Sequence, residues 1–371
     1  MAKLLDYLKW RGDLPLGYDG FCELDAAVMA RLSYVPFELV SEHVRRDGVE
    51  LKELAVYLTA APGVRDRVLS PHDLELCRQV SECRRYEGVK VYEYVCRLDV
   101  ESETQFSAMS FRLDEGKCCV AFRGTDNTLI GWKEDLNMGF TFPVPAQVSA
   151  AEYLDKLAQS MDSRHFILCG HSKGGNLAVY AGSFCAEETR RRIVSVYNFD
   201  GPGFDMQALE KQGMTLALDD VRTFVPQSSV VGMLFDNDRP YNVVFSEAGG
   251  LMQHDIYSWQ TRGRSFVGAT GLTDASRKLD ASLGVWMHGM STEERAAFVD
   301  TVYQILTQNN AKTIDQLSSL KFESAMTTLK TIRNLDEKTR SNALKAVQLL
   351  MLSLKSEVLS KDEEEAKTNG S

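Results

Sequence analysis

The sequence lacks several features that define other classes of protein. No apolar run approaches the roughly 20 residues needed to span a membrane, and residues 1–10 lack the uninterrupted apolar stretch of a secretory signal peptide. The eight cysteines show no metal-site spacing. Basic residues are not in excess: 52 acidic residues outnumber 42 basic ones, which gives a net charge of −10. This charge argues against nucleic acid or an anionic membrane surface as a general partner.

These absences predict a protein that is neither secreted nor membrane-spanning. Several cysteines lie in apolar runs, where a free thiol acts as a small hydrophobic group, so we expect a reducing, cytoplasmic location. The chain has 371 residues, of which 44% are hydrophobic and 25% charged, as is typical of globular proteins. This length predicts one elaborated domain, or a domain with a smaller appendage.

The residue pattern divides the chain into four parts. Residues 1–85 have apolar residues at helical spacing, and residues 86–265 begin with β-rich runs and continue as alternating strands and helices. Residues 266–360 return to helical spacing, and the acidic segment 361–371 is predicted to be a disordered tail. Alternating strands and helices predict an α/β fold with a largely parallel sheet.

A short glycine-rich stretch marks the end of one predicted strand. The pattern G-x-S-x-G, which runs from Gly170 to Gly174 around Ser172, lies between a strand-like run at 165–169 and a helix-like run at 176–185. Glycine at these positions relieves the clashes of an abrupt strand-to-helix turn, so the stretch has the pattern of a nucleophile elbow. The alternative is an ordinary glycine-rich turn without chemistry.

A serine nucleophile needs a base and an orienting acid. Asp200 closes the next predicted strand, and because parallel strands end at the same edge of a sheet, we expect it near Ser172. Asp236 and Asp238 follow a later strand and stay as competing acids.

His254 is the predicted base. It follows the last strand-like run, at 242–245, and completes the chain order Ser, Asp, His. His288 is the alternative, since it also follows the strands. We expect His165 at the opposite edge of the sheet, and His171 pointing into the sheet or its flank.

Donors for an oxyanion are predicted at two positions. One is the backbone amide of Lys173, and the other is Thr125, which follows a strand exit and offers an amide and a hydroxyl. Trp132 and Asp135 are candidates to brace the Thr125 loop. The ammonium group of Lys173 either lines the rim of the pocket, favouring an anionic substrate, or pairs with an acid.

Three motifs together resemble the class 3 lipase pattern. They are Phe122-Arg-Gly-Thr125, the segment from Gly131 to Asp135, and Gly170-His-Ser-Lys-Gly-Gly-Asn-Leu-Ala178. The segments YNFDGPGF and QHD make the chain most similar to a bacterial branch of lipase-like domains of unknown function. The resemblance covers roughly residues 15 to 265.

This resemblance implies an α/β-hydrolase fold, with 86–265 as its core, 1–85 as its helical N-terminal part and 266–360 as a helical C-terminal extension. Class 3 lipases usually place the acid at the strand exit that corresponds to 225–229, where this chain has serines. Asp200 instead resembles the acid of pancreatic-type lipases.

The expected function is that of a serine hydrolase that cleaves an acyl ester. Ser172, His254 and Asp200 form the expected triad, and neither a cofactor nor a metal is expected. The resemblance implies a small-molecule or lipid ester as substrate. A thioesterase, an amidase or an acyltransferase would use the same three residues, and a catalytically silent scaffold is the alternative from another class.

Overall fold

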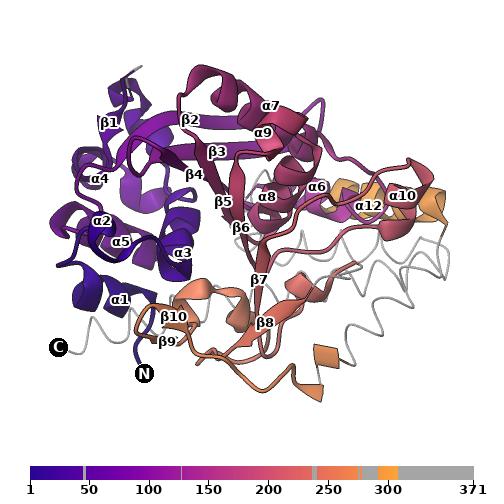
Figure 1. Ribbon diagram of the computed structural model, residues 1–371. Helices are drawn as coiled ribbons and strands as arrows, with labels where there is room; N and C mark the ends of the chain where they lie inside the picture. The colour runs from indigo at the N-terminus through magenta and orange to yellow at the C-terminus, as the bar shows by residue number, and fades with distance from the viewer. Residues whose placement is uncertain (45–46, 127, 236–239, 275, 278–290, 308–371) are drawn as a thin grey trace.

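The computed structural model describes residues 1–44, 47–126, 128–235, 240–274, 276–277 and 291–307 (Figure 1). Within them, a sheet of eight strands has helices on both faces. The strands of this sheet are β1 (Val49–Glu50), β2 (Lys90–Asp99), β3 (Thr104–Arg112), β4 (Lys117–Phe122), β5 (His165–His171), β6 (Ile193–Phe199), β7 (Val221–Pro226) and β8 (Tyr241–Val244).

The helices before the sheet and between its strands are as follows: α1 (Leu4–Arg11), α2 (Leu16–Asp19), α3 (Glu23–Leu32), α4 (Leu51–Ala60), α5 (Pro71–Glu82), α6 (Leu129–Asn137), α7 (Pro145–Ser160), α8 (Lys173–Phe184), α9 (Glu187–Arg190) and α10 (Met206–Lys211). Helix α12 (Thr292–Thr307) packs against α6. Short 3₁₀ turns include η3 (Val231–Met233), η4 (Gly250–His254) and η5 (Ile256–Ser258). A small hairpin, β9 (Thr261–Arg262) with β10 (Ser265–Phe266), follows them.

The order of the strands in the sheet is the same as their order in the chain. Strands β1 to β4 pair antiparallel, whereas β4 to β8 pair parallel. The carboxyl ends of β4 to β8 therefore meet at one edge of the sheet. The prediction of an α/β-hydrolase fold, with a mostly parallel sheet flanked by helices, is confirmed.

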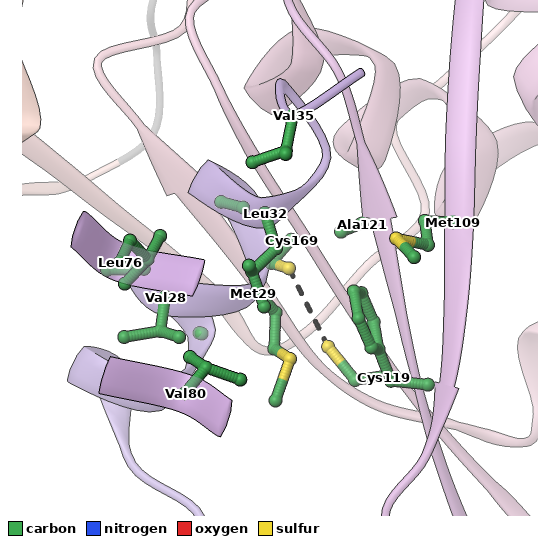
Figure 2. Close-up of a cluster of buried hydrophobic side chains, with 14 of the residues drawn as sticks. Val28, Met29, Leu32, Val35, Leu76, Val80, Met109, Cys119, Ala121 and Cys169 are labelled. Atoms are coloured by element: carbon green, nitrogen blue, oxygen red, sulfur yellow. Dashed lines mark hydrogen bonds between the residues drawn. The ribbon is translucent and has the colours of Figure 1, made fainter. Parts of the chain in front are cut away.

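One face of the sheet is covered by the N-terminal helices. Helix α3 packs on β4, β5 and β6, and α5 packs against α3 from outside. Figure 2 shows the apolar contacts in this layer, where Met29 and Leu32 of α3 lie toward Cys119 and Cys169 of the sheet, and Val28 lies toward Leu76 and Val80 of α5. The sulfur atoms of these two cysteines are 3.6 Å apart, and all eight cysteines are free thiols.

The opposite face is covered by α7 and α8, whose apolar side chains form a second core with β3 to β6. Leu154 and Leu157 of α7 and Leu177 of α8 are fully buried there. The two buried layers fix the sheet from both sides, so the strand exits are held by packed elements.

The predicted elements agree with the structure, with small differences. Residues 1–85 are mainly helical as predicted, except that Val49–Glu50 pairs with β2 as a two-residue strand. Ser291 and Glu294 form the predicted capping box at the start of α12. The structure does not test the domain boundaries, which stay predictions.

Other predictions fall outside the described residues. They concern Asp236, Asp238, His288 and the segment from about 308 to the C-terminus. In the part of the chain that is described, no helix is both long and apolar enough to cross a membrane. Likewise, no group of three His, Cys, Asp or Glu side chains within it could hold a metal ion.

Candidate active site

The predicted elbow lies where β5 turns into α8. Ser172 has a φ of 57° and a ψ of −137°, a backbone conformation that a non-glycine residue rarely adopts. A Cβ atom on Gly170 would overlap the backbone of Gly174, and one on Gly174 would overlap the carbonyl of Phe122. The glycines are therefore needed for close contact between strand and helix, as the sequence predicted.

Asp200 lies beside the elbow, at the exit of β6. The amide of Ser172 donates to the carbonyl of Phe199 at 2.9 Å, which brings the turn after β6 against the elbow. A Cβ atom on Gly201 would come within 2.7 Å of the carbonyl oxygen of Ser172. Asp200 has a φ of 50°, so two neighbouring turns at this edge carry strained non-glycine residues. Such strain concentrates at functional sites.

The carboxylate of Asp200 is fully buried and satisfied by three donors. Oδ2 lies 2.7 Å from Nδ1 of His254, and Oδ1 accepts from the hydroxyl of Ser229 and from the amide of Gly232 at 3.2 Å. A buried charge needs such partners. Ser229 belongs to the serine-containing exit of β7, so this exit supplies a donor to the acid.

His254 ends the short turn η4, and its side chain is 28% exposed. Its ring lies 4.6 Å from the ring of His171, which is the residue before Ser172. No hydrogen bond joins the ring of His254 to Ser172 among the described residues. In unliganded sites this bond is often long and tightens only when substrate is bound.

His171 is buried next to the elbow, and its Nε2 lies 2.7 Å from the backbone carbonyl of His254. Burial lowers the pKa of His171 well below its usual range, and the nearby His254 and Arg31 lower it further. His171 is therefore neutral at physiological pH. The sequence placed its ring in the sheet or its flank and gave no sign of the contact with His254. His165 lies, as predicted, at the start of β5.

Thr125 lies in the loop after β4, on the other side of Ser172. A Cβ atom on the preceding residue, Gly124, would be 3.1 Å from Cβ of Ser172, so the loop passes close to the elbow. The Thr125 hydroxyl donates to Oδ2 of Asp135, which confirms the predicted brace by Asp135. Desolvation raises the pKa of Asp135 to about 6, against the lowering effect of Lys173 and Thr125. The carboxylate accepts the hydrogen bond from the Thr125 hydroxyl.

The side chain of Lys173 points away from the solvent and is 1% exposed. Its Nζ lies 2.9 Å from Oε2 of Glu134, 3.4 Å from Oδ1 of Asp135 and 2.9 Å from Oε1 of Gln105. Burial alone would lower the pKa of this ammonium group, but the two carboxylates outweigh burial and raise it. The prediction of a pair with an acid is confirmed, and the alternative in which the ammonium lines the rim is wrong. The packing of α6 against β3 brings the acids to it.

Several solved structures resemble this fold at low sequence identity. The Rhizomucor miehei lipase propeptide complex is 15% identical over 73% of this chain and 78% of that chain, with a TM-score of 0.37. A fungal lipase–inhibitor complex is 15% identical over 66% and 92%, with a TM-score of 0.35. M37 lipase is 12% identical over 72% and 80%, with a TM-score of 0.33. No curated protein is similar enough in sequence to match.

A family model covers most of the sheet and the whole elbow. The model described as Mbeg1-like matches residues 80–304, which is more than half of the chain. The matched region includes Thr125, Ser172, Asp200 and His254, the residues that the strand exits bring to one edge. This chain belongs to the Mbeg1-like family.

Proposed function

We propose that the protein is a serine hydrolase that cleaves an acyl ester. The observation that carries the proposal is the 2.7 Å contact between His254 and Asp200 beside an elbow serine with positive φ. A serine hydroxyl is a weak nucleophile at neutral pH and needs an oriented base of this kind. The resemblance to class 3 lipases favours a lipid-like acyl group as substrate.

In the proposed reaction, Ser172 attacks the ester carbonyl while His254 accepts the hydroxyl proton through Nε2. Asp200 accepts the hydrogen bond of Nδ1–H, which holds the ring in the required tautomer and stabilises the imidazolium. His254 then protonates the leaving alcohol, leaving an acyl group on Ser172. Water, deprotonated by the same histidine, releases the acid and restores the serine.

Two backbone amides are the proposed oxyanion donors. The amide of Lys173 is in the first turn of α8, where backbone donors lack partners within the helix and the dipole favours negative charge. The amide of Thr125 is the second donor. The single proton of the Thr125 hydroxyl forms the hydrogen bond to Asp135, so the hydroxyl is not the oxyanion donor in this arrangement.

Replacing Thr125 by valine separates these two groups, because Thr125→Val removes the hydroxyl and keeps the amide. We expect turnover of a p-nitrophenyl acyl ester to stay within about tenfold of wild type, since loss of one oxyanion donor typically costs about 10² to 10³. Steady-state kinetics on the folded variant measures this. A fall of the larger size would assign the hydroxyl as the donor and contradict the amide assignment.

A fluorophosphonate probe tests the proposed function directly, because it reacts with activated serines. We expect the purified protein to be labelled once, and Ser172→Ala to abolish the labelling. Ser160→Ala is the matched control, because Ser160 is exposed at the end of α7 and its hydroxyl only caps a carbonyl. Absence of labelling in the native protein would reject the hydrolase and favour the silent scaffold.

A further inference from the structure

A tyrosine from the N-terminal helical part contacts two parts of the proposed site, the residue before the elbow serine and the oxyanion loop. Tyr34 follows α3 and is buried, with 5% of its surface exposed. Its hydroxyl donates to the backbone carbonyl of His171 at 2.9 Å and lies 3.2 Å from Nδ1 of the same residue. A Cβ atom on Gly124 would overlap this hydroxyl, so the phenol also packs against the oxyanion loop.

The ring of His171 continues this contact to the proposed base. A carbonyl oxygen can only accept, so Nε2 of His171 carries the proton that bonds to the carbonyl of His254. Because the ring is neutral, Nδ1 is then an acceptor like the carbonyl of the same residue, so the single hydroxyl proton of Tyr34 is shared between these two acceptors in a three-centre hydrogen bond. Burial raises the pKa of Tyr34, which keeps its hydroxyl protonated as a donor.

Tyr34 is held by a buried ion pair on the N-terminal helices. The guanidinium of Arg31 lies 4.4 Å from the centre of the Tyr34 ring and 2.6 Å from Oδ1 of Asp73. Oδ1 of Asp73 also accepts from the hydroxyl of Tyr257 at 2.8 Å, in the turn that follows His254. The helices therefore reach the His254 loop by two routes, one through His171 and one through Tyr257.

We propose that Tyr34 is a positioning residue that aligns His254 and the Thr125 loop with Ser172, acting through His171. The inference rests on the proposed hydrolase function and deepens it. Tyr34, Arg31 and Asp73 all precede the region 80–304 that the family model matches. The alignment of the site thus depends on a part of the chain outside that region.

The test compares two buried tyrosines that lose the same atom. Tyr34→Phe removes the hydroxyl beside His171, whereas Tyr86→Phe removes a hydroxyl that donates to Asp25 at 3.0 Å, in a separate cluster. We expect Tyr34→Phe to lower kcat for a p-nitrophenyl ester roughly 10- to 100-fold, as small misplacements of reacting groups do. KM should stay within about twofold, because substrate contacts are unchanged. Tyr86→Phe should keep kcat and shift the melting temperature by a similar amount.

The outcomes separate this inference from the proposed function. If wild-type protein is not labelled by the fluorophosphonate, the hydrolase proposal fails. If wild type is labelled and Tyr34→Phe keeps the kcat of Tyr86→Phe, the positioning role alone is overturned.

Nitrogen-15 NMR of the histidines in the wild-type protein tests the same arrangement without a variant. We expect His171 to be protonated on Nε2 and to take up its second proton only below the usual histidine range, because burial lowers its pKa. Protonation on Nδ1 would overturn the inference.

Discussion

Replacing Asp200 by asparagine is expected to lower turnover by about 10⁴-fold while the protein stays folded, as loss of an orienting acid does in serine hydrolases. The asparagine oxygen can still accept from Ser229 and Gly232, so the buried turn keeps its donors. Its amide group would face Nδ1 of His254 as a donor. The histidine would then carry its proton on Nε2, where it cannot accept the proton of Ser172.

Steady-state turnover of a p-nitrophenyl ester, together with circular dichroism, measures this effect. Asp205→Asn is the matched control, because Asp205 caps α10 and asparagine caps equally well. Near-normal turnover of Asp200→Asn would contradict the assignment of the acid. The same substitution at Asp236, which lies outside the described residues, would then test the alternative.

Replacing Lys173 by leucine is expected to destabilise the fold by about 3 to 5 kcal/mol, the usual cost of breaking a buried ion pair. The substitution would leave the fully buried Glu134, and Asp135 beside it, without their shared cation. Total stability is typically only about 5 to 15 kcal/mol. Urea unfolding followed by fluorescence measures the loss, and KM for anionic and neutral esters should change equally.

Lys133→Leu is the control for this loss. Lys133 pairs with Glu103 and Asp300, whose side chains are 37% and 58% exposed, so water can replace the lost partner. Its loss of stability should be much smaller. Equal losses in the two variants would contradict the structural role of Lys173, as would a rise in KM confined to anionic esters.

The pH dependence of the Lys173→Leu deficit gives an independent check. In the folded Lys173→Leu variant, which lacks the ammonium group, the pKa of Asp135 should rise above its present value of about 6. It would then lie even further above the pKa of the same group in the unfolded chain. A carboxyl group with a raised folded pKa makes the folded state less stable as pH increases through that range. The deficit should therefore shrink as pH falls from about 8 to 5. A deficit that grows toward acid pH would contradict this explanation.

The local parts of the site could be predicted from the sequence. Gly170 and Gly174 have the spacing that a tight strand-to-helix turn requires, so the elbow could be predicted from a few residues. The position of Asp200 followed from chain order, because the structure pairs each parallel strand with its neighbour in sequence. The direction of the Lys173 side chain could not be predicted, since it depends on how α6 packs against β3.

The contacts of Tyr34 could not be predicted from the sequence, for a different reason. Tyr34 follows the apolar stripe of α3, where an aromatic residue is expected to be ordinary core. Its partner His171 is 137 residues further along the chain, and only the packing of α3 on β4 to β6 brings them together. The role of Ser229 could be predicted only in part. Ser229 follows a predicted strand, but its hydrogen bond to Asp200 depends on the bend of the loop after β7.

The sequential order of the strands has a consequence for biosynthesis. Because each strand from β2 to β8 pairs with the strand made just before it, the sheet can grow at one edge while the chain emerges from the ribosome. Among the described strands of the sheet, none has to wait for a later strand to be inserted between it and its predecessor. Ser172, Asp200 and His254 emerge in that order, so a nascent chain acquires the proposed base last. The proposed hydrolytic centre would thus be completed only after all eight strands of the sheet have been synthesised.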